Sequence, residues 1–283
     1  MALAFLNGRY LPAEQASVSV FDRGYTLGDG VYEVIPVYHG QIFRLQPHLE
    51  RLQRSLDGLR ITNPYHQSQW QDILQTLVAN NGGGEQSLYV QVTRGVALRD
   101  HAFPADCVPS TLVISSEVSS PSPQHYPAGV SAITLADSRW QHCHIKTISL
   151  AANVLLRQQA AEQGCAEAIL IRDGLLTEGA ASNILIVERG VIVTPPPSQY
   201  LLSGITRDLI SVLAKQHKIG FIEENVPVAR LRQADEIWMS SSLREITAIT
   251  QLDGQRVGNG EPGPLWRQML DLYRDYKNSL AAL

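Results

Sequence analysis

The stretch Val31-Tyr32-Glu33-Val34-Ile35-Pro36-Val37-Tyr38 predicts a β-strand, because branched and aromatic side chains predominate in it. Pro36 indicates an edge strand or a bulge, since proline donates no hydrogen bond to a neighbouring strand. His39-Gly40 is expected to turn the chain into a second strand at residues 41–45. Residues 47–59 then place leucines on one face of a helix. This succession is not a regular βαβ alternation, so it favours an α+β or irregular α/β fold.

The rest of the chain shows the same mixture of short elements. Residues 5–11 are expected to form a hairpin that turns at Asn7-Gly8. Other strands are expected at residues 87–94, 111–118, 129–135, 167–172, 183–188, 191–194, 236–240 and 245–249, and other helices at residues 65–80, 151–163, 206–217 and 266–278. Residues 119–127 contain three prolines and predict a linker. The expected organisation is a domain at 1–118, a linker at 119–128 and a second domain at 129–283.

The overall composition excludes several classes of protein. With 44% hydrophobic and 18% charged residues, the chain is expected to be globular. The net charge of −4 argues against nucleic acid as a partner. The sequence has neither an apolar run long enough to cross a bilayer nor the pattern of a secretory signal, so no membrane partner is expected. The three cysteines do not have the spacing of a disulfide framework, which favours reduced thiols in a cytoplasmic protein.

Lys146 is the first lysine in the sequence, although many arginines precede it. It lies in the partly apolar, strand-like run His142-Cys143-His144-Ile145-Lys146-Thr147-Ile148-Ser149-Leu150, whereas the other lysines lie in polar, helix-like segments. Arginine stays charged, but lysine can lose its proton and attack a carbonyl to form a Schiff base. The alternative is a lysine at a strand edge that reaches into water.

The residues His142-Cys143-His144 are of types that bind metals. The two histidines would share a face of a strand, but no third ligand is near in the sequence. We therefore expect ordinary strand residues and no metal site.

A carbonyl cofactor on Lys146 would need further groups around it. Residues 202–207 open a helix after a run of prolines, and the free N–H groups of a helix N-terminus attract anions such as phosphate. Thr206, Arg51 and the serines at 240–242 could add contacts. The alternatives are an ordinary helix cap, a solvated arginine and a polar turn.

Two further segments carry charges that a cofactor or a substrate could use. Glu178 falls between two apolar strands, where it could pair with a protonated ring nitrogen, or it could be a turn residue in water. Arg99 and His101 lie two residues apart in a loop and could hold a carboxylate, or they could belong to a basic surface loop.

Taken together, these segments resemble the fold-type IV pyridoxal-phosphate enzymes, a family of branched-chain aminotransferases, D-amino acid aminotransferases and aminodeoxychorismate lyases. The resemblance covers nearly the whole chain. It is carried by residues 19–24, 28–33, 44–52, 145–147, 177–179, 182–183 and 204–207. It implies a two-domain fold with a smaller N-terminal α/β domain, a larger C-terminal domain and pyridoxal 5′-phosphate at their interface.

Residues 29–38 and 94–104 are similar to the D-amino acid aminotransferase branch. This resemblance implies a ping-pong transamination between D-amino acids such as D-alanine and 2-oxo acids such as 2-oxoglutarate. The alternatives within the family are an aminodeoxychorismate lyase and a branched-chain-type aminotransferase. Branched-chain relatives carry a tyrosine five residues after the lysine, and Ala151 at that place argues against their subclass. A ligand-binding protein with a surface lysine remains the alternative from another class.

The resemblance also implies roles for individual residues. Lys146 would form the Schiff base, and Glu178 would pair with the pyridine nitrogen. The other implied cofactor contacts are Arg51, Ser182, Leu202, Ile205, Thr206, Ser241 and Ser242. Tyr32, Arg99 and His101 would hold the substrate carboxylate; the last two would reach in from a partner subunit, which implies a homodimer. The sequence departs from the branch at Ala180 and Ala181, where serines are common, and at Ser242, where threonine is common.

Overall fold

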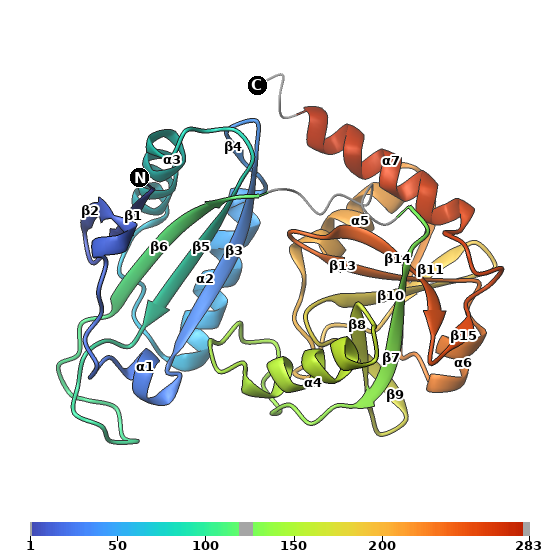
Figure 1. The fold of residues 1–283 in the computed structure, drawn as a ribbon, viewed down its shortest axis with the longest axis horizontal. Helices are drawn as coiled ribbons and strands as arrows, with labels where there is room; N and C mark the ends of the chain where they lie inside the picture. Colours follow the sequence, from blue (N-terminus) through green and yellow to red (C-terminus); the bar gives the residue numbers. More distant parts are fainter. Residues whose placement is uncertain (1, 119–126, 280–283) are drawn as a thin grey trace. The chain divides into compact units, whose positions relative to one another are not determined.

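A computed structural model describes residues 2–118 and 127–279 (Figure 1). The predicted linker at 119–128 lies almost wholly outside the described residues. Contacts divide the chain into two compact units. Unit 1 contains the described residues up to 118 together with Ile145–Leu150, and unit 2 contains those from 127 to His144 and Ala151–Ser279. The Lys146 segment thus makes its contacts with unit 1, although the expected boundaries assign it to the second domain.

The described part of unit 1 is built on an antiparallel sheet of six strands. Their order is β2 (Arg9–Pro12), β1 (Leu3–Leu6), β6 (Ser110–Glu117), β5 (Gln86–Thr93), β3 (Gly30–Tyr38) and β4 (Gln41–Ile42). The predicted hairpin is confirmed: β1 and β2 join at Asn7 and Gly8, whose φ angles of 48° and 85° suit an Asn-Gly turn. A short helix that the sequence did not predict, α1 (Arg23–Leu27), begins where the Asp22 carboxylate accepts a hydrogen bond from the Gly24 N–H.

The strand β3 lies next to the edge of this sheet. It pairs with β5 from Gly30 to Val37, while β4 pairs only with Val37 and Tyr38 on the other side. Among the described residues, Pro36 therefore pairs with Ser87 of β5 and with no named strand on the other side, although the edge strand of the sheet is β4 and not β3. The strand predicted at 41–45 is shorter in the structure, because Arg44 adopts a φ of 51° and the helix begins at Leu45.

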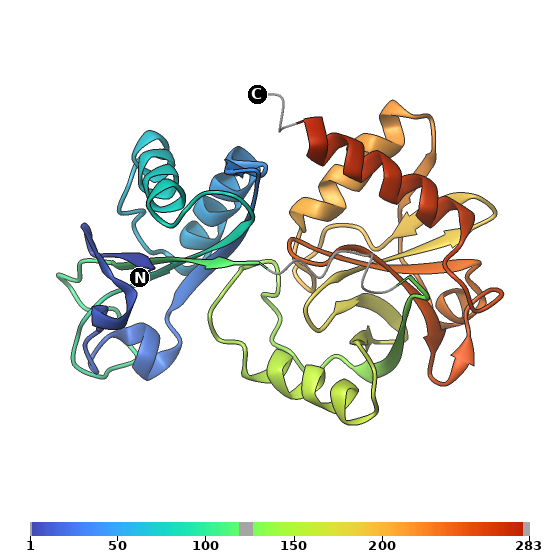
Figure 2. The same cartoon turned by 45° about the horizontal axis from the view of Figure 1, so that its top comes forward.

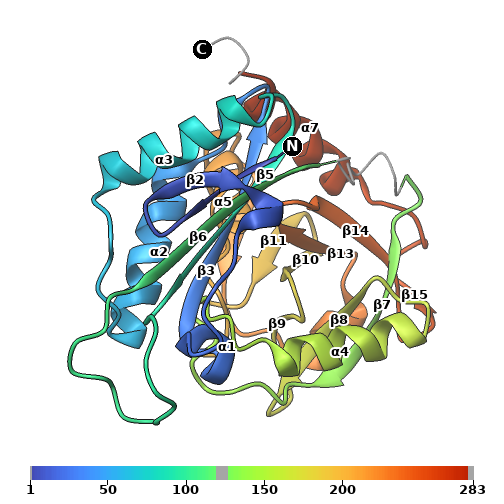
Figure 3. The ribbon, with the colours of Figure 1, turned by 60° about the vertical axis from the view of Figure 1, so that its left-hand side comes forward.

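Two helices, α2 (Leu45–Leu59) and α3 (Gln67–Asn80), cover one face of the sheet (Figure 3). They bury Leu49, Leu52, Leu56, Trp70, Leu74 and Leu77 against Val31, Ile35, Leu88 and Val90 of the strands. Each such side chain contributes on the order of 1.5–3 kcal/mol when it is fully buried. The periodic leucines that predict α2 form part of this core, and their packing holds β3 against α2.

Unit 2 contains a mixed sheet. Its described strands follow the order β12 (Gly220–Glu223), β11 (Val191–Thr194), β10 (Asn183–Glu188), β13 (Glu236–Ser241), β14 (Glu245–Leu252), β7 (Val130–Ala136), β8 (Glu167–Arg172) and β9 (Leu175–Gly179), and β15 (Gln255–Arg256) pairs with β14. Parallel pairs, such as β7 with β8, adjoin antiparallel pairs, such as β10 with β13. This mixture confirms the expected irregular α/β character.

Helices flank the second sheet. Figure 2 shows α5 (Ile205–Gln216) and α7 (Pro264–Ser279) side by side. The helix α4 (Ala151–Glu162) packs Leu156 and Ala160 against β7 and β8, and α6 (Val228–Gln233) places Leu231 in a separate apolar cluster. Within the described residues, none of the helices combines the length and the apolar character that a membrane crossing requires.

Several local expectations were wrong. Glu178 lies inside the strand β9 rather than between strands, and β9 itself, β12 and α6 were not predicted. The run from His142 to Leu150 is not a strand. Its backbone forms one described bridge, an isolated one between Thr147 and Val31, where a strand would pair over several residues. His142 and His144 are exposed in this run. Among the residues that the structure describes there is no cluster of three or more His, Cys, Asp or Glu that could hold a metal ion.

Candidate functional site

Lys146 is fixed to unit 1 through its backbone. The Tyr32 N–H donates to the Lys146 carbonyl at 2.9 Å, and the Lys146 N–H donates to Ser55 Oγ at 3.1 Å. On the next residue, Thr147 Oγ1 donates to the Gly30 carbonyl at 3.1 Å. The Lys146 Nζ lies 4.1 Å from the centroid of the Tyr32 ring. The amine is thus placed over a side chain of β3 by hydrogen bonds that do not involve the amine itself.

A buried ionic group lies beside this lysine in unit 1. Arg51 Nε and Nη2 donate to the two oxygens of Glu33 at 2.7 and 2.8 Å, and His48 Nδ1 lies 2.7 Å from Glu33 Oε2. Burial alone would raise the pKa of Glu33, but the charge and hydrogen bonds of Arg51 and the hydrogen bond of His48 lower it below its usual range. Burial also lowers the pKa of His48, and the Lys146 charge acts in the same direction. Arg51 is therefore held rigidly on α2 by a permanent anion.

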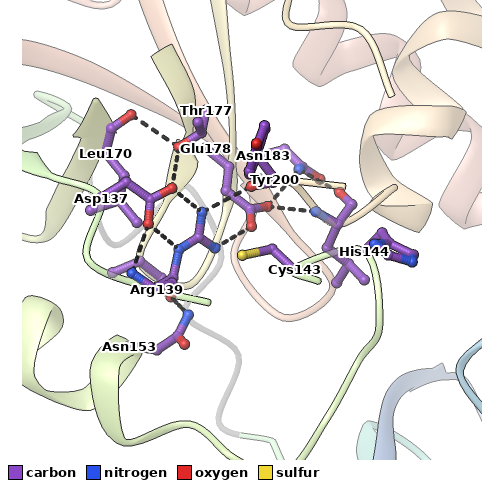
Figure 4. Close-up of polar contacts among 12 residues, drawn as sticks. Asp137, Arg139, Cys143, His144, Asn153, Leu170, Thr177, Glu178, Asn183 and Tyr200 are labelled. Atoms are coloured by element: carbon purple, nitrogen blue, oxygen red, sulfur yellow. Dashed lines mark hydrogen bonds and ion pairs between the residues drawn. The ribbon is translucent and has the colours of Figure 1, made fainter. Parts of the chain in front are cut away.

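Glu178 is the centre of a second group, in unit 2 (Figure 4). Its Oε1 accepts a hydrogen bond from Arg139 Nη1. Its Oε2 accepts from Asn183 Nδ2 at 3.2 Å and from the Leu202 N–H at 3.0 Å. Burial raises the pKa of Glu178 to about 7, although the charge and hydrogen bond of Arg139 and the hydrogen bond of the Leu202 N–H oppose the rise. The sequence alternative of a turn glutamate in water is excluded, since the residue is buried within β9.

Arg139 is itself held by several acceptors. Its Nε and Nη2 donate to the two oxygens of Asp137, each at 2.9 Å, and Nη2 also donates to the Tyr200 carbonyl at 3.1 Å. Asp137 accepts a further hydrogen bond from Thr177 Oγ1 at 3.0 Å. Burial would raise the pKa of Asp137, but the hydrogen bonds and charge of Arg139 lower it. A bidentate pair of this kind fixes the plane of the guanidinium.

The N-terminus of α5 adjoins Glu178 through Asn183. Asn183 donates from Nδ2 to the Leu202 carbonyl at 2.8 Å as well as to Glu178, and its backbone pairs with Ser240 at the end of β13. A Cβ at Gly204, the cap of α5, would overlap Asn183 Oδ1, so only glycine allows this approach. Leu202, Gly204 and Ser240 thus lie around one buried amide.

The remaining expected cofactor contacts lie near these elements. Ile205 and Thr206 are buried in the first turn of α5, whose cap residue is Gly204. Ser182 Oγ donates to the buried Glu167 at 2.8 Å. Ser241 Oγ accepts from the Arg244 N–H at 3.4 Å, and Ser242 follows directly after β13.

Arg99 and His101 are exposed in the loop between β5 and β6. Arg23 Nη1 supports this loop by donating to the Asp100 carbonyl at 2.6 Å, and the Arg94 guanidinium lies 3.7 Å from the centroid of the Phe103 ring. No described hydrogen bond or ion pair joins Arg99 or His101 to Lys146. Of the three expected substrate contacts, Tyr32 has a described contact with Lys146 within this chain, and Arg99 and His101 have none.

Sequence reasoning missed Asp137, Arg139, Glu33 and His48. A signal existed for Glu33, because a carboxylate inside a strand of branched side chains needs a buried partner. Asp137-Ser138-Arg139 follows the strand β7 directly, and charges at a strand end are a weaker hint of a site. The partner of Arg139 lies 39 residues away, so that pairing was visible only in the fold.

Residues 30–252 match the model of the amino-transferase class IV family. This protein belongs to the class IV aminotransferases. The D-alanine aminotransferase of Bacillus licheniformis is 39% identical over 263 residues, which are 93% of each chain. The D-alanine aminotransferase of Staphylococcus aureus (strain MW2) is 38% identical over 279 residues, which are 99% of each chain.

A solved structure shares the same fold. It is the branched-chain amino acid aminotransferase of T.th., complexed with N-(5′-phosphopyridoxyl)-L-glutamate, and it superimposes with a TM-score of 0.91 at 25% identity. The match covers 98% of this chain and 94% of that one. The expected fold-type IV architecture is therefore confirmed.

Proposed function

We propose that this protein is a pyridoxal 5′-phosphate-dependent aminotransferase that moves the amino group between D-amino acids and 2-oxo acids. D-Alanine and 2-oxoglutarate are the expected substrate pair. The observation that carries the proposal is the similarity to two D-alanine aminotransferases over nearly the whole chain. Family membership supports the reaction type, and the similar branched-chain enzyme with its phosphopyridoxyl compound supports the cofactor.

The residues of the chain fit this cofactor chemically. When bound, pyridoxal phosphate supplies an electron sink next to the reacting carbon. Glu178 offers a buried carboxylate to a ring nitrogen, and the N-terminus of α5 at Gly204 and Thr206 offers N–H groups to a phosphate. Ser182, Leu202, Ile205, Ser241 and Ser242 are the other contacts that we propose for the cofactor. Arg51 would add a fixed positive charge, since Glu33 and His48 hold its orientation.

Lys146 would carry both covalent and proton-transfer roles. Its amine lies over Tyr32 and is a primary amine able to bind a carbonyl. When it is not bound to the cofactor, the same Nζ would remove the proton from the substrate Cα as a general base and return it to the C4′ carbon of the cofactor. Tyr32, Arg99 and His101 would orient the substrate carboxylate, because a guanidinium and an imidazole match a planar anion. This orientation would present the Cα proton of the D-enantiomer to Lys146.

We also propose a homodimer in the cytoplasm. Exposed apolar side chains, named here the apolar surface, gather on the segments before and within α1 and on the β5–β6 loop of unit 1: Val18, Val20, Phe21, Tyr25, Val96, Leu98, Phe103 and Val108. The two segments touch, because the Ala97 N–H donates to the Phe21 carbonyl at 3.2 Å. A large exposed apolar patch favours association with another protein surface. The three cysteines, Cys107, Cys143 and Cys165, are free, as a reducing compartment favours.

A panel of D- and L-amino acids with 2-oxoglutarate tests the function. We expect pyruvate from D-alanine and little product from the L-enantiomer, and we expect Lys146→Ala to lose both activity and the visible absorption of the bound cofactor. Preference for L-leucine or L-valine would instead support the branched-chain reaction that the similar solved structure is named for. A wild-type protein that binds no pyridoxal phosphate would contradict the whole proposal.

A further inference from the structure

The hydrogen bonds that Glu178 already accepts limit how many more donors it can bind and on which oxygen (Figure 4). An ionised carboxylate offers about four acceptor sites on its two oxygens. Within the described residues, three donors reach Glu178: Arg139 Nη1 on Oε1, and Asn183 Nδ2 and the Leu202 N–H on Oε2. One more donor can therefore be accommodated, and it must share Oε1 with the Arg139 guanidinium.

The position of Arg139 is fixed independently of Glu178. Two of its donors bind the fully buried side chain of Asp137, and the Tyr200 carbonyl takes a further hydrogen bond. The backbone of Arg139 is also anchored, since Arg172 Nη2 donates to its carbonyl at 2.9 Å. The guanidinium therefore cannot turn away when another donor approaches Glu178.

The charges around Glu178 balance one another. Asp137 and Glu178 are two carboxylates, and Arg139 and Arg172 are two cations, so these four groups carry no net charge when all are ionised. Arg172 lies 3.3 Å from Asp137, and its guanidinium lies 4.6 Å from the centroid of the Tyr200 ring. Cys143 is a further titratable side chain at this site. Burial raises the pKa of Cys143 to about 11, so its thiol is neutral.

We propose that Arg139 is a positioning residue that keeps the proton shared by Glu178 and the cofactor's ring nitrogen on the ring nitrogen. This inference rests on the proposed function. Arg139 donates a hydrogen bond directly to Glu178. Its charge therefore lowers the proton affinity of the carboxylate more than the proton affinity of a ring nitrogen that is bonded to the same Oε1. With the carboxylate held as an anion, a protonated pyridine ring is the better electron sink. Asp137 acts one step further back, because it fixes the fork of Arg139.

Four variants test this role in the enzyme loaded with ring-¹⁵N pyridoxal phosphate. Arg139→Gln removes the charge, Arg139→Lys keeps it without the fork, and Asp137→Asn removes the anchor. Arg232→Gln is the matched control, because Arg232 forms a surface ion pair with Asp253 in the same unit. The ¹⁵N resonance of the ring is recorded between about pH 6 and pH 9, together with the kcat and KM for D-alanine.

We expect wild type and Arg232→Gln to keep the ring nitrogen protonated throughout. Arg139→Gln should shift the resonance toward the unprotonated position and lower kcat about 100-fold with little change in KM. Arg139→Lys should restore part of the protonated signal, and Asp137→Asn should lose part of it. If Arg139→Gln does not fold, the lysine and asparagine variants carry the same comparison.

The inference is overturned if folded Arg139→Gln, or both of the other site variants, show the wild-type resonance at every pH. Failure of the proposed function gives a different result. A wild type that binds the labelled cofactor but transaminates no D-amino acid would refute the substrate assignment, while the resonances would still measure the effect of Arg139. A wild type that binds no cofactor would refute both proposals.

Discussion

Glu178 links the chemistry of the candidate site to the stability of unit 2. Burial raises its pKa to about 7 from an ordinary value of 4.5. Its protonated form is therefore favoured by folding, so this residue contributes stability that is fully present below about pH 4.5 and is lost as the pH rises through about 7. In the protein without cofactor, Glu178→Gln should gain stability relative to wild type over this range, by up to about 3 kcal/mol.

Urea unfolding at several values between about pH 5 and pH 8 measures this difference. Glu188→Gln is a suitable control, because its hydrogen bond with Arg230 lowers the pKa of Glu188 and places its titration below this range. A constant offset between Glu178→Gln and wild type across the range would contradict the assigned direction. A constant offset is the expected behaviour of the Glu188 variant.

Replacing Glu33 in unit 1 should lower stability, whereas replacing Glu178 should raise it. It pairs with Arg51 through two hydrogen bonds and with His48 through a third, and all three residues are buried. Glu33→Gln would replace the carboxylate that binds Arg51 by a neutral amide, and removing one partner of a buried ion pair destabilises a protein by about 3–5 kcal/mol. Urea unfolding should show this loss, whereas Glu85→Gln, which breaks an exposed contact with His39, should change stability by less than about 1 kcal/mol. A loss as small as that of Glu85→Gln would refute the role of Glu33.

The residues with unusual chemistry could be identified from the sequence better than their partners. Lys146 stands out because it is a lysine in a chain that uses arginine for most of its positive charges. Glu178 stands out because its carboxylate lies among apolar residues. Arg139 was missed because arginine is common in this sequence and nothing local distinguishes a buried one. Which arginine reaches Glu178 depends on the pairing of strands β8 and β9, which a local pattern does not contain.

Elements with a clear period were predicted, and elements stabilised by distant contacts were not. The leucines of α2 and the branched residues of β3 identify both elements directly. In contrast, β9 has the sequence Leu-Leu-Thr-Glu-Gly, whose polar half resembles a turn. The isoleucines of the Lys146 run suggest a strand, but its backbone is held instead by hydrogen bonds to Tyr32 and Ser55.

The N-terminus of α5 yields a prediction about cofactor affinity. A methyl group at Gly204 would overlap Asn183 Oδ1 and push the first turn away from Glu178 and Leu202. Gly204→Ala should therefore weaken binding of pyridoxal phosphate by at least about tenfold, as measured by titration of the cofactor absorption. Gly164→Ala controls for general strain, because Gly164 has a φ of 69° and open space around it. Equal affinity in the two variants would argue against α5 as the phosphate site.

The whole fold is shared with enzymes that are named for other substrates. The branched-chain aminotransferase of T.th. has a TM-score of 0.91 to this chain at 25% identity, so the fold alone cannot assign the amino acid used. In our proposal, the exposed loop that carries Arg99 and His101 discriminates between amino acid substrates. That loop also carries half of the apolar surface, which connects substrate choice with assembly.

Assembly can be tested by a single charge on the apolar surface. Leu98 is 82% exposed and lies next to Arg99, so Leu98→Asp would place a carboxylate in the proposed contact between two copies of the chain. We expect sedimentation velocity to show a monomer and activity with D-alanine to fall, since Arg99 would no longer reach a partner. Ile222→Asp alters an exposed residue of unit 2, 46% accessible and outside the apolar surface, and should leave both properties unchanged. If Leu98→Asp sediments as wild type does, the apolar surface is not the dimer contact, and the substrate role of Arg99 would need another geometry.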